Sequence, residues 1–213
     1  VILNNDRTLL VGDVLLAASF ISYVGPFTKP FRERLLNEQW IPFMKKGFGG
    51  ESIPMTENPN PINILTNDAE IASWNTQGLP PDQVSTENGT IVCNTARWAL
   101  MIDPQLQGIK WIKEKESGAD RNLKIVRLGQ NDLLSKLERA LENGWTILVE
   151  NMGERIDAVL NPVVQRATIK KGNRFYVKLG DTEVEFSPKF RLILHTKLSN
   201  PHFPPEIQAE TTL

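Results

Sequence analysis

The stretch WALMIDPQLQGIKWIK, residues 98–113, joins a short apolar run, a tight loop and a helical pattern. Trp98–Ile102 is apolar throughout, which predicts a buried strand, and Ile109–Glu116 has the polar spacing of an amphipathic helix. A strand, a tight loop and a helix in this order open the phosphate-binding unit of nucleotide-binding α/β domains. The stretch therefore favours an α/β fold, and its loop is the first candidate for a functional site.

Toward the C-terminus the chain keeps alternating between strand and helix patterns, as parallel α/β sheets do. We expect an amphipathic helix that Asn131 or Asp132 caps and Gly144 ends, and another helix around Ile156–Val164. The expected strands are Leu123–Leu128, Trp145–Val149, Phe190–His195 and Thr211-Thr212-Leu213, with a hairpin of Phe175–Leu179 and Glu183–Phe186 around Gly180-Asp181.

Toward the N-terminus the apolar spacing predicts helices over the first ~45 residues. The expected boundaries are an N-cap at Asp13, an interruption at Gly25-Pro26, a second N-cap at Thr28, and an end at Gly47, Gly49 and Gly50. A loop over Glu51–Asn63, a short helix around Ile64–Trp74 and a turn at Gly78–Asp82 follow, while Ser85–Asn94 fits a helix or a strand. The predicted fold is α/β, with a parallel sheet flanked by helices, a β-hairpin insertion and an N-terminal helical segment.

Composition excludes several classes of protein. The 213 residues carry 24 Lys and Arg against 25 Asp and Glu, so no net basic field attracts nucleic acid or an anionic membrane. A single cysteine, Cys93, and two histidines, His195 and His202, argue against a disulfide framework and a metal centre. No apolar run is long enough to span a bilayer and no leader pattern opens the chain, so we interpret it as cytosolic.

The loop after the first strand departs from the phosphate-binding pattern G-x-x-x-x-G-K-[ST]. Asp103 stands at the opening glycine, Gly108 matches the second glycine, Ile109 replaces the lysine, and Lys110 replaces the hydroxyl residue. Asp103 places negative charge where phosphate oxygens would lie, and no hydroxyl is present for Mg²⁺. We interpret the loop as a strand-to-helix turn; residual nucleotide binding is the alternative.

Two further strand ends carry polar residues. Glu150 and Asn151 follow the third strand, where nucleotide hydrolases place one acid near Mg²⁺ and a second acid near the attacking water. Glu150 fits the first task, whereas an amide such as Asn151 cannot act as a base. Thr196 ends the strand that contains His195, in the position of a residue that senses phosphate. Structural roles are the preferred interpretation: Glu150 caps or pairs with a neighbouring element, Thr196 closes the sheet, and His195 is a satisfied core or interface histidine.

The basic segment Lys170–Arg174 precedes the predicted hairpin. A solvated turn is the preferred interpretation, and a docking patch is the alternative. The chain begins at Val1 without methionine and ends in the strand-like Thr211-Thr212-Leu213, so we expect it to be an excised fragment.

Motifs spread over the whole chain resemble the fifth AAA+ module of dynein heavy chains. They are Gly12–Ala17, Gly78-Leu79-Pro80, Ser85–Asn88, Ile102–Gln105, Trp111-Ile112-Lys113 and Thr196–His202, in this order. The patterns Leu106–Lys113 and Phe190–Lys197 resemble the axonemal outer-arm β-type heavy chains in particular.

The resemblance implies one AAA+ large-subdomain fragment over residues 1–213. Residues 1–46 would lead from the stalk and residues 47–213 would form the α/β core, ending short of the small helical lid. In the parent chain six modules form a ring; the first hydrolyses ATP to drive movement on microtubules, and the fifth and sixth are structural. ATP and Mg²⁺ would then bind at other modules, with no cofactor on this chain.

The resemblance also implies partners and a location. The partners would be neighbouring AAA+ modules, the stalk and its buttress helices, and microtubules only through the parent chain, in the cytoplasm and cytoskeleton of a cilium or flagellum axoneme. Glu210 stands where some relatives carry an arginine that could serve a neighbouring nucleotide. We expect a structural, non-hydrolysing module that relays force; a regulatory or slow ATPase using Glu150 and Thr196 is the alternative.

Overall fold

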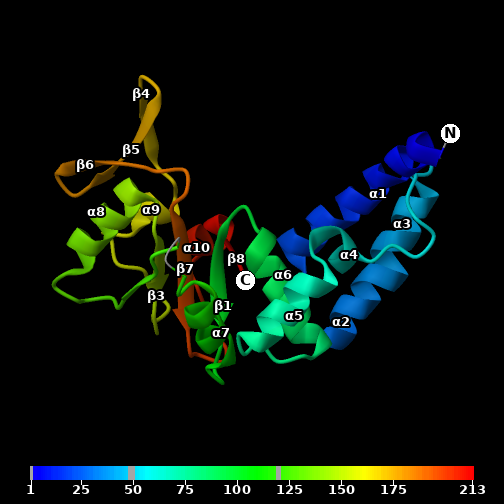
Figure 1. The fold of residues 1–213 in the computed structure, drawn as a ribbon, viewed down its shortest axis with the longest axis horizontal. Coiled ribbons are helices and arrows are strands. Elements are labelled where there is room, and N and C mark those ends of the chain that lie inside the picture. The colour runs from blue at the N-terminus through cyan, green and yellow to red at the C-terminus, as the bar shows by residue number, and fades with distance from the viewer. Residues whose placement is uncertain (1, 48–50, 119–120) are drawn as a thin grey trace. The chain divides into compact units, whose positions relative to one another are not determined.

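The computed structural model describes residues 2–47, 51–118 and 121–213, and the side chains from residue 7 onward (Figure 1). The chain divides into two compact units: a helical unit formed by the residues up to 76 together with 80–95, and an α/β unit formed by 77–79 and 96–213. Each is described by itself below.

The helical unit is built on two long helices that lie alongside each other (Figure 1). Its elements are α1 (Ile2–Tyr23), α2 (Lys29–Arg34), η1 (Leu35–Trp40), α3 (Ile41–Lys46), α4 (Pro61–Leu65), α5 (Asp68–Thr76) and α6 (Gln83–Asn94). The predicted helical N-terminal segment is confirmed, and it ends at Gly47, whose φ of 77° few other residues adopt. Gly49 and Gly50 lie outside the described residues.

The second long helix, α2–η1–α3, contains a π-helical segment. Within it the N–H of Ile41 donates to the carbonyl of Leu36, five residues earlier. Pro42 follows immediately; it has no N–H, and in an α-helix its ring would clash with the carbonyl four residues before it. We attribute the wider turn to this proline, which the helix accommodates without a break.

Of the two N-caps predicted in this unit, Asp13 is wrong and Thr28 is confirmed in position only. Asp13 lies inside α1, because the helix begins at Ile2, and its Oδ1 accepts hydrogen bonds from the N–H and hydroxyl of Thr56 at 3.0 and 3.1 Å. A Cβ on Gly12 would lie 2.5 Å from the carbonyl oxygen of Pro54, so the missing side chain lets the loop approach. Gly12 and Asp13 therefore tether the loop to α1. Thr28 holds the N-cap position of α2, but its side chain makes no capping hydrogen bond.

The segments between the long helices and the sheet also differ in detail from the prediction. The single helix expected around Ile64–Trp74 is split into α4 and α5, because Asn60 and Asn67 each cap a separate helix start. The ambiguous segment Ser85–Asn94 is helical: Asp82 caps α6 by accepting from the N–H of Ser85.

The α/β unit contains a five-stranded parallel sheet in the order β2-β3-β7-β1-β8 and a three-stranded antiparallel sheet β4-β5-β6. Its strands are β1 (Trp98–Ile102), β2 (Lys124–Val126), β3 (Thr146–Val149), β4 (Thr168–Lys171), β5 (Arg174–Leu179), β6 (Thr182–Glu185), β7 (Arg191–Thr196) and β8 (Thr211–Thr212). Its helices are α7 (Gln107–Lys115), α8 (Leu133–Asn143), α9 (Asn161–Val164) and α10 (Pro205–Glu210). The predicted fold class, a parallel sheet flanked by helices with a hairpin insertion, is confirmed (Figure 1).

One helix of this unit was predicted too long, and one strand was missed. The helix expected around Ile156–Val164 is shortened to α9, because Asp157 forms a turn with the N–H of Val159 and Pro162 restricts the residue before it. The segment Lys170–Arg174 is an exposed turn that precedes the β5–β6 hairpin, as expected; the prediction missed only that it also pairs β4 with β5, turning at Gly172 with a φ of 61°. The predicted β5–β6 hairpin at Gly180-Asp181 is confirmed.

Candidate functional site

The carboxyl ends of the central strands meet at one edge of the parallel sheet, where the sequence places its polar residues. The N–H of Asp103, just after β1, donates to the carbonyl of Thr196 at the end of β7 over 2.9 Å. The N–H of Met152, just after β3, donates to the carbonyl of His195 over 2.8 Å. The strand ends that carry Asp103, Thr196 and the Glu150-Asn151 pair are therefore joined through backbone hydrogen bonds.

Asp103 folds its carboxylate back onto the first turn of α7. Its Oδ1 accepts from the N–H of Gln107 at 3.0 Å, and its Oδ2 accepts from the N–H of Ile109 at 2.8 Å. The backbone bends back this sharply because Leu106 adopts a left-handed φ of 59°. In a phosphate-binding loop, N–H groups at this start of the helix hold the phosphate oxygens. Here the carboxylate of Asp103 accepts the hydrogen bonds of these N–H groups instead.

The other residues of the loop point away from this place. Ile109, at the lysine position, is 4% exposed and packs into the core, while Lys110 is exposed on the outer face of α7. Gly108 lies against the sheet: a Cβ there would come 2.7 Å from the Cε of Met101. The loop therefore offers a ligand neither a lysine ammonium at the usual position nor a hydroxyl.

His195 is the site residue whose geometry the sequence did not reveal. Its side chain is 1% exposed, and its Nδ1 accepts a hydrogen bond from the N–H of Asn151 at 3.1 Å. An accepting Nδ1 places the proton of the neutral ring on Nε2. Nε2 faces Oδ2 of Asp103 at 3.7 Å, beyond hydrogen-bond distance, and makes no hydrogen bond within the described part of the chain.

Glu150 joins α7 to the segment that follows β2. Its carboxylate lies 2.7 Å from Nζ of Lys113 and 2.8 Å from a guanidinium nitrogen of Arg127. Asn151 is exposed with a left-handed φ of 55°, and Thr196 is fully buried, its hydroxyl accepting from the N–H of Leu198 at 3.2 Å. Glu150 thus pairs with neighbouring elements, and the hydroxyl of Thr196 is engaged inside the chain.

The surroundings favour the charged forms of both acids. Burial raises the pKa of Asp103, but the imidazole N–H of His195 and the backbone N–H groups of α7 together outweigh it and hold the pKa below its ordinary value. The ammonium of Lys113, with the guanidinium of Arg127, likewise outweighs partial burial and lowers the pKa of Glu150. Neither acid is poised to exchange a proton near neutral pH.

Replacing Glu150 with glutamine is expected to lower the free energy of unfolding by about 0.5–1 kcal/mol, because the partners Lys113 and Arg127 are partly exposed. The pKa of Glu150 is lower in the folded state, so its contribution is complete above the unfolded pKa of about 4.3 and disappears as the pH falls through the folded pKa. Urea unfolding at pH 7 and at pH 3 measures both values. Lys136→Met, which removes an exposed pair with Asp132, is the control; a mutant difference that grows toward pH 3 would contradict this account.

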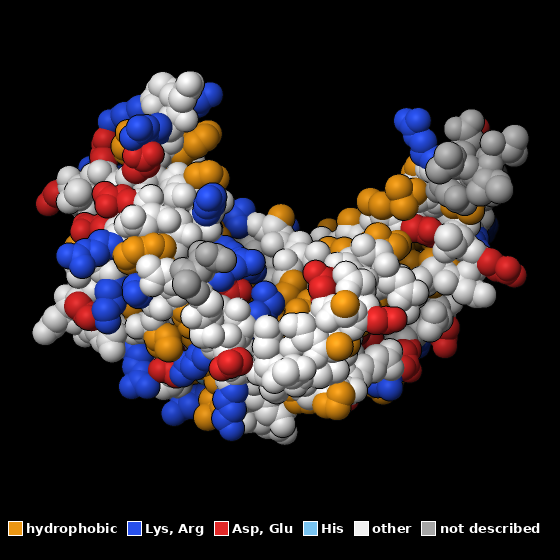
Figure 2. Space-filling view, in the orientation of Figure 1, with side chains coloured by type: hydrophobic (Ala, Val, Ile, Leu, Met, Phe, Trp, Pro, Cys, Tyr) orange, Lys and Arg blue, Asp and Glu red, His pale blue; other side chains and the backbone are white. Residues whose placement is uncertain are grey.

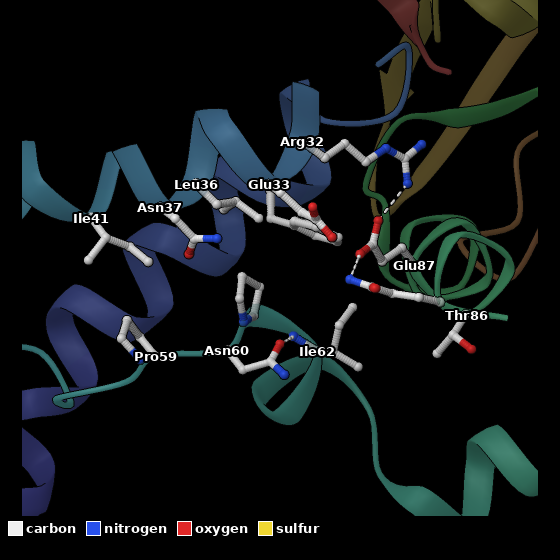
Figure 3. A pocket seen from close by; sticks show the side chains of 13 residues that line it. Arg32, Glu33, Leu36, Asn37, Ile41, Pro59, Asn60, Ile62, Thr86 and Glu87 are labelled. Atoms are coloured by element: carbon white, nitrogen blue, oxygen red, sulfur yellow. Dashed lines mark hydrogen bonds and ion pairs between the residues drawn. The ribbon is translucent and has the colours of Figure 1, made fainter. Parts of the chain in front are cut away.

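A groove of about 430 Å³ opens in the helical unit between α2–η1, the turn before α4, and α6 (Figure 3). At one end Arg32 and Glu87 point toward each other and form an ion pair of 2.8 Å, although both side chains are buried. Arg32 also donates to the carbonyls of Phe27 and Gly25 and to Oδ1 of Asn88, each over 2.8 Å. Because its guanidinium is engaged and 3% exposed, this arginine acts as a structural junction of three segments.

Exposed apolar side chains gather along α1, where Leu10, Val11, Val14 and Leu15 are 43–61% exposed (Figure 2). Exposed apolar residues this close together on one helix are a candidate contact surface. Within the described ranges, no helix is long and apolar enough to cross a membrane. The same residues contain no cluster of three His, Cys, Asp or Glu side chains that could hold a metal ion.

Comparison with known proteins identifies the family. The sequence profile described as "ATP-binding dynein motor region" matches residues 72–213, more than half of the chain, and the profile "Microtubule-binding stalk of dynein motor" matches residues 2–44. The chain is 55% identical over 99% of its length to the dynein alpha chain of the flagellar outer arm of Chlamydomonas reinhardtii. It is 54% identical over 96% of its length to the ciliary dynein beta chain of Heliocidaris crassispina and to dynein axonemal heavy chain 17 of Mus musculus.

The chain covers only 4–5% of the length of these relatives. Its helical N-terminus lies in the region of the stalk profile, and its parallel sheet lies in the region of the motor profile. The chain therefore belongs to the dynein heavy-chain family, within the motor region that follows the microtubule-binding stalk.

Proposed function

We propose that this chain is a structural, non-hydrolysing AAA+ module of a dynein motor ring, which relays ATP-driven rearrangement of the ring to the stalk. The observation that carries the proposal is the Asp103 carboxylate, which occupies the N–H groups of Gln107 and Ile109 at the start of α7. A phosphate group would have to displace this anion, and it would find Ile109 where a phosphate-binding lysine normally lies.

The residues around the sheet edge also argue against hydrolysis. Glu150 is neutralised by Lys113 and Arg127, and Asn151 offers no carboxylate to polarise a water molecule. Glu210, in the short helix α10, would repel a γ-phosphate on a neighbouring module where an arginine would stabilise it. A regulatory ATPase would need Glu150 released from both cations, so we give it second place.

The relatives suggest where such a module works. Their names place them in flagellar outer arms, cilia and axonemes, and we propose the axoneme of a cilium or flagellum for this chain as well. The stalk profile ends at residue 44, and the exposed apolar residues of α1 lie within it. We propose that this face packs against the remainder of the stalk base and that adjacent ring modules contact the α/β unit. ATP and Mg²⁺ would act at other modules.

The hairpin β4–β5 is a second candidate contact surface, as its basic residues suggested. Lys171 pairs with Glu183, and Arg174 pairs with Glu185 at 2.8 Å, so much of its charge is matched within the sheet. Its docking role stays a prediction. Charge reversal at Lys170 and Lys171 tests it through retention of the buttress helices in a pull-down.

Thermal unfolding of the chain with and without millimolar ATP and Mg²⁺ tests the proposal. We expect no change in the midpoint, because a ligand that binds the native state adds about 2.7 kcal/mol at 100 times its Kd and would be readily detected. A saturable rise in the midpoint, together with phosphate release that Glu150→Gln abolishes, would favour the regulatory ATPase instead.

A further inference from the structure

The groove of the helical unit has an apolar floor and a polar rim (Figure 3). Its volume of about 430 Å³ lies within the roughly 300–1,000 Å³ that is typical of ligand sites. The floor consists of buried or half-buried side chains, namely Phe20, Leu36, Ile41, Pro61 and Ile62. The rim consists of exposed polar side chains, namely Glu33, Asn37, Asn60 and Gln83. Open space, apolar surface and polar groups therefore meet in one place.

One wall of this groove is the π-helical segment η1. The N–H of Ile41 donates to the carbonyl of Leu36, and both side chains line the groove. In an α-helix, residues five apart point about 140° away from each other. A π-helical turn, in which the hydrogen bond itself joins residues five apart, brings them onto nearly the same side, and such turns are frequent at functional sites. The wide turn thus adds Ile41 to the apolar wall that Leu36 begins.

The rim carries two carboxamides that come from different segments, Asn37 from η1 and Asn60 from the turn before α4 (Figure 3). Asn60 caps α4 with its Oδ1, which accepts from the N–H of Ile62 at 3.0 Å, and its NH₂ group is left as a donor. A carboxamide both donates and accepts, so these side chains are complementary to the N–H and C=O of a peptide main chain. An α-helix uses those groups internally, whereas an extended segment exposes them. The rim therefore suits an extended segment.

The charge of the groove favours a basic side chain in its occupant. Arg32 and Glu87 neutralise each other in their buried pair of 2.8 Å. Among the described residues that line the groove, this leaves the carboxylate of Glu33 as the remaining charge. The Glu33 side chain is 50% exposed, and Nζ of Lys29 lies 3.8 Å away from its carboxylate. Because an exposed pair of this kind is weak, a cation of the occupant can compete for the carboxylate.

We propose that the groove binds an extended segment of a protein partner in which an apolar side chain lies next to a lysine or arginine. Successive side chains of an extended chain point to opposite faces, so the apolar one packs on Leu36 and Ile62 while its basic neighbour points to the rim. There the cation pairs with Glu33, and Asn37 and Asn60 bind the main chain. The site uses none of the residues on which the proposed function rests, so the failure of one leaves the other standing.

The test uses three capped peptides and follows the side-chain amide resonances of Asn37 and Asn60 in the whole chain by NMR. Acetyl-Leu-Lys-Ala-N-methylamide is expected to shift both resonances in a saturable manner. The peptide with glutamate in place of lysine should bind at least threefold more weakly, because its charge meets Glu33. The peptide with serine in place of leucine should bind about tenfold more weakly, because it loses the apolar contact with the floor. No saturable shift, or equal binding of all three peptides, would overturn the proposal.

Matched variants on the exposed side of η1 and α2 locate the contacts. Glu33→Gln should weaken binding of the lysine peptide about threefold, whereas Glu38→Gln, which removes an exposed carboxylate outside the groove, should not. Asn37→Ala should weaken it about fivefold, the effect of one hydrogen bond, and Gln39→Ala should leave it unchanged. All four residues are exposed, so the variants are expected to fold. Equal losses in the groove and control variants would overturn the proposal, and so would binding of acetyl-lysine-N-methylamide as tightly as the tripeptide.

Discussion

Replacing Arg32 with methionine is expected to lower the stability of the helical unit by about 3–5 kcal/mol. This is the effect of breaking a buried ion pair by removing one partner, which leaves the other charge uncompensated. Glu87 is 6% exposed, and of its hydrogen bonds among the described residues it would keep the one that the side-chain amide of Gln83 donates over 2.9 Å. The carbonyls of Gly25 and Phe27 would lose the guanidinium as well. Hydrogen exchange of the amides in α2 and α6 measures the loss.

Two further variants separate charge from packing. Lys29→Met removes an exposed pair with Glu33, at 3.8 Å, and should change stability by less than about 0.5 kcal/mol. The double variant Arg32→Met/Glu87→Leu should be more stable than Arg32→Met alone, because no unpaired charge remains buried. A loss below about 1 kcal/mol in the single variant would show that water reaches Glu87 and that the pair is not a structural junction.

Sequence reasoning succeeded where one segment determines its own structure. Trp98–Ile102 is continuously apolar and is the strand β1, and Gly144 ends α8 in the left-handed conformation. It failed where the structure of a segment depends on contacts with residues far away in the sequence. Asp13 has the residue type of a helix cap, yet its partner is Thr56, which no local pattern indicates. Strand β4 is exposed at every position, so it lacks the alternation of a half-buried strand and owes its structure to pairing with β5.

The candidate site was predictable in its residue types but not in its geometry. The sequence places Asp103 and Ile109 at the wrong positions for phosphate binding. It does not show that the Asp103 carboxylate turns back onto α7, because this depends on the left-handed conformation of Leu106. The pairing of Arg32 with Glu87 was missed for a related reason: 55 residues separate them, and each alone resembles an ordinary surface charge.

The second large effect concerns the α/β unit. Replacing Trp111 with alanine is expected to lower its stability by about 3–5 kcal/mol, because the side chain is 1% exposed and its removal leaves a large cavity beneath α7. Since α7 also carries the donors that hold Asp103, the same change should loosen the loop after β1. Hydrogen exchange should accelerate at Gln107 and Ile109 and in β1, measured on the whole chain.

Trp145→Ala provides a matched control in the same unit. This indole is only partly buried and lies 5.0 Å from Nζ of Lys124, so its removal creates less cavity and should cost clearly less than the removal of Trp111. Trp111 and Arg32 belong to different compact units, so we expect Trp111→Ala to leave exchange in α2 and α6 unchanged and Arg32→Met to leave β1 unchanged. If either variant lowered hydrogen-exchange protection equally in both units, the two units would unfold as one cooperative body. Loss of protection in the mutated unit alone would show that each side chain stabilises the unit in which it lies.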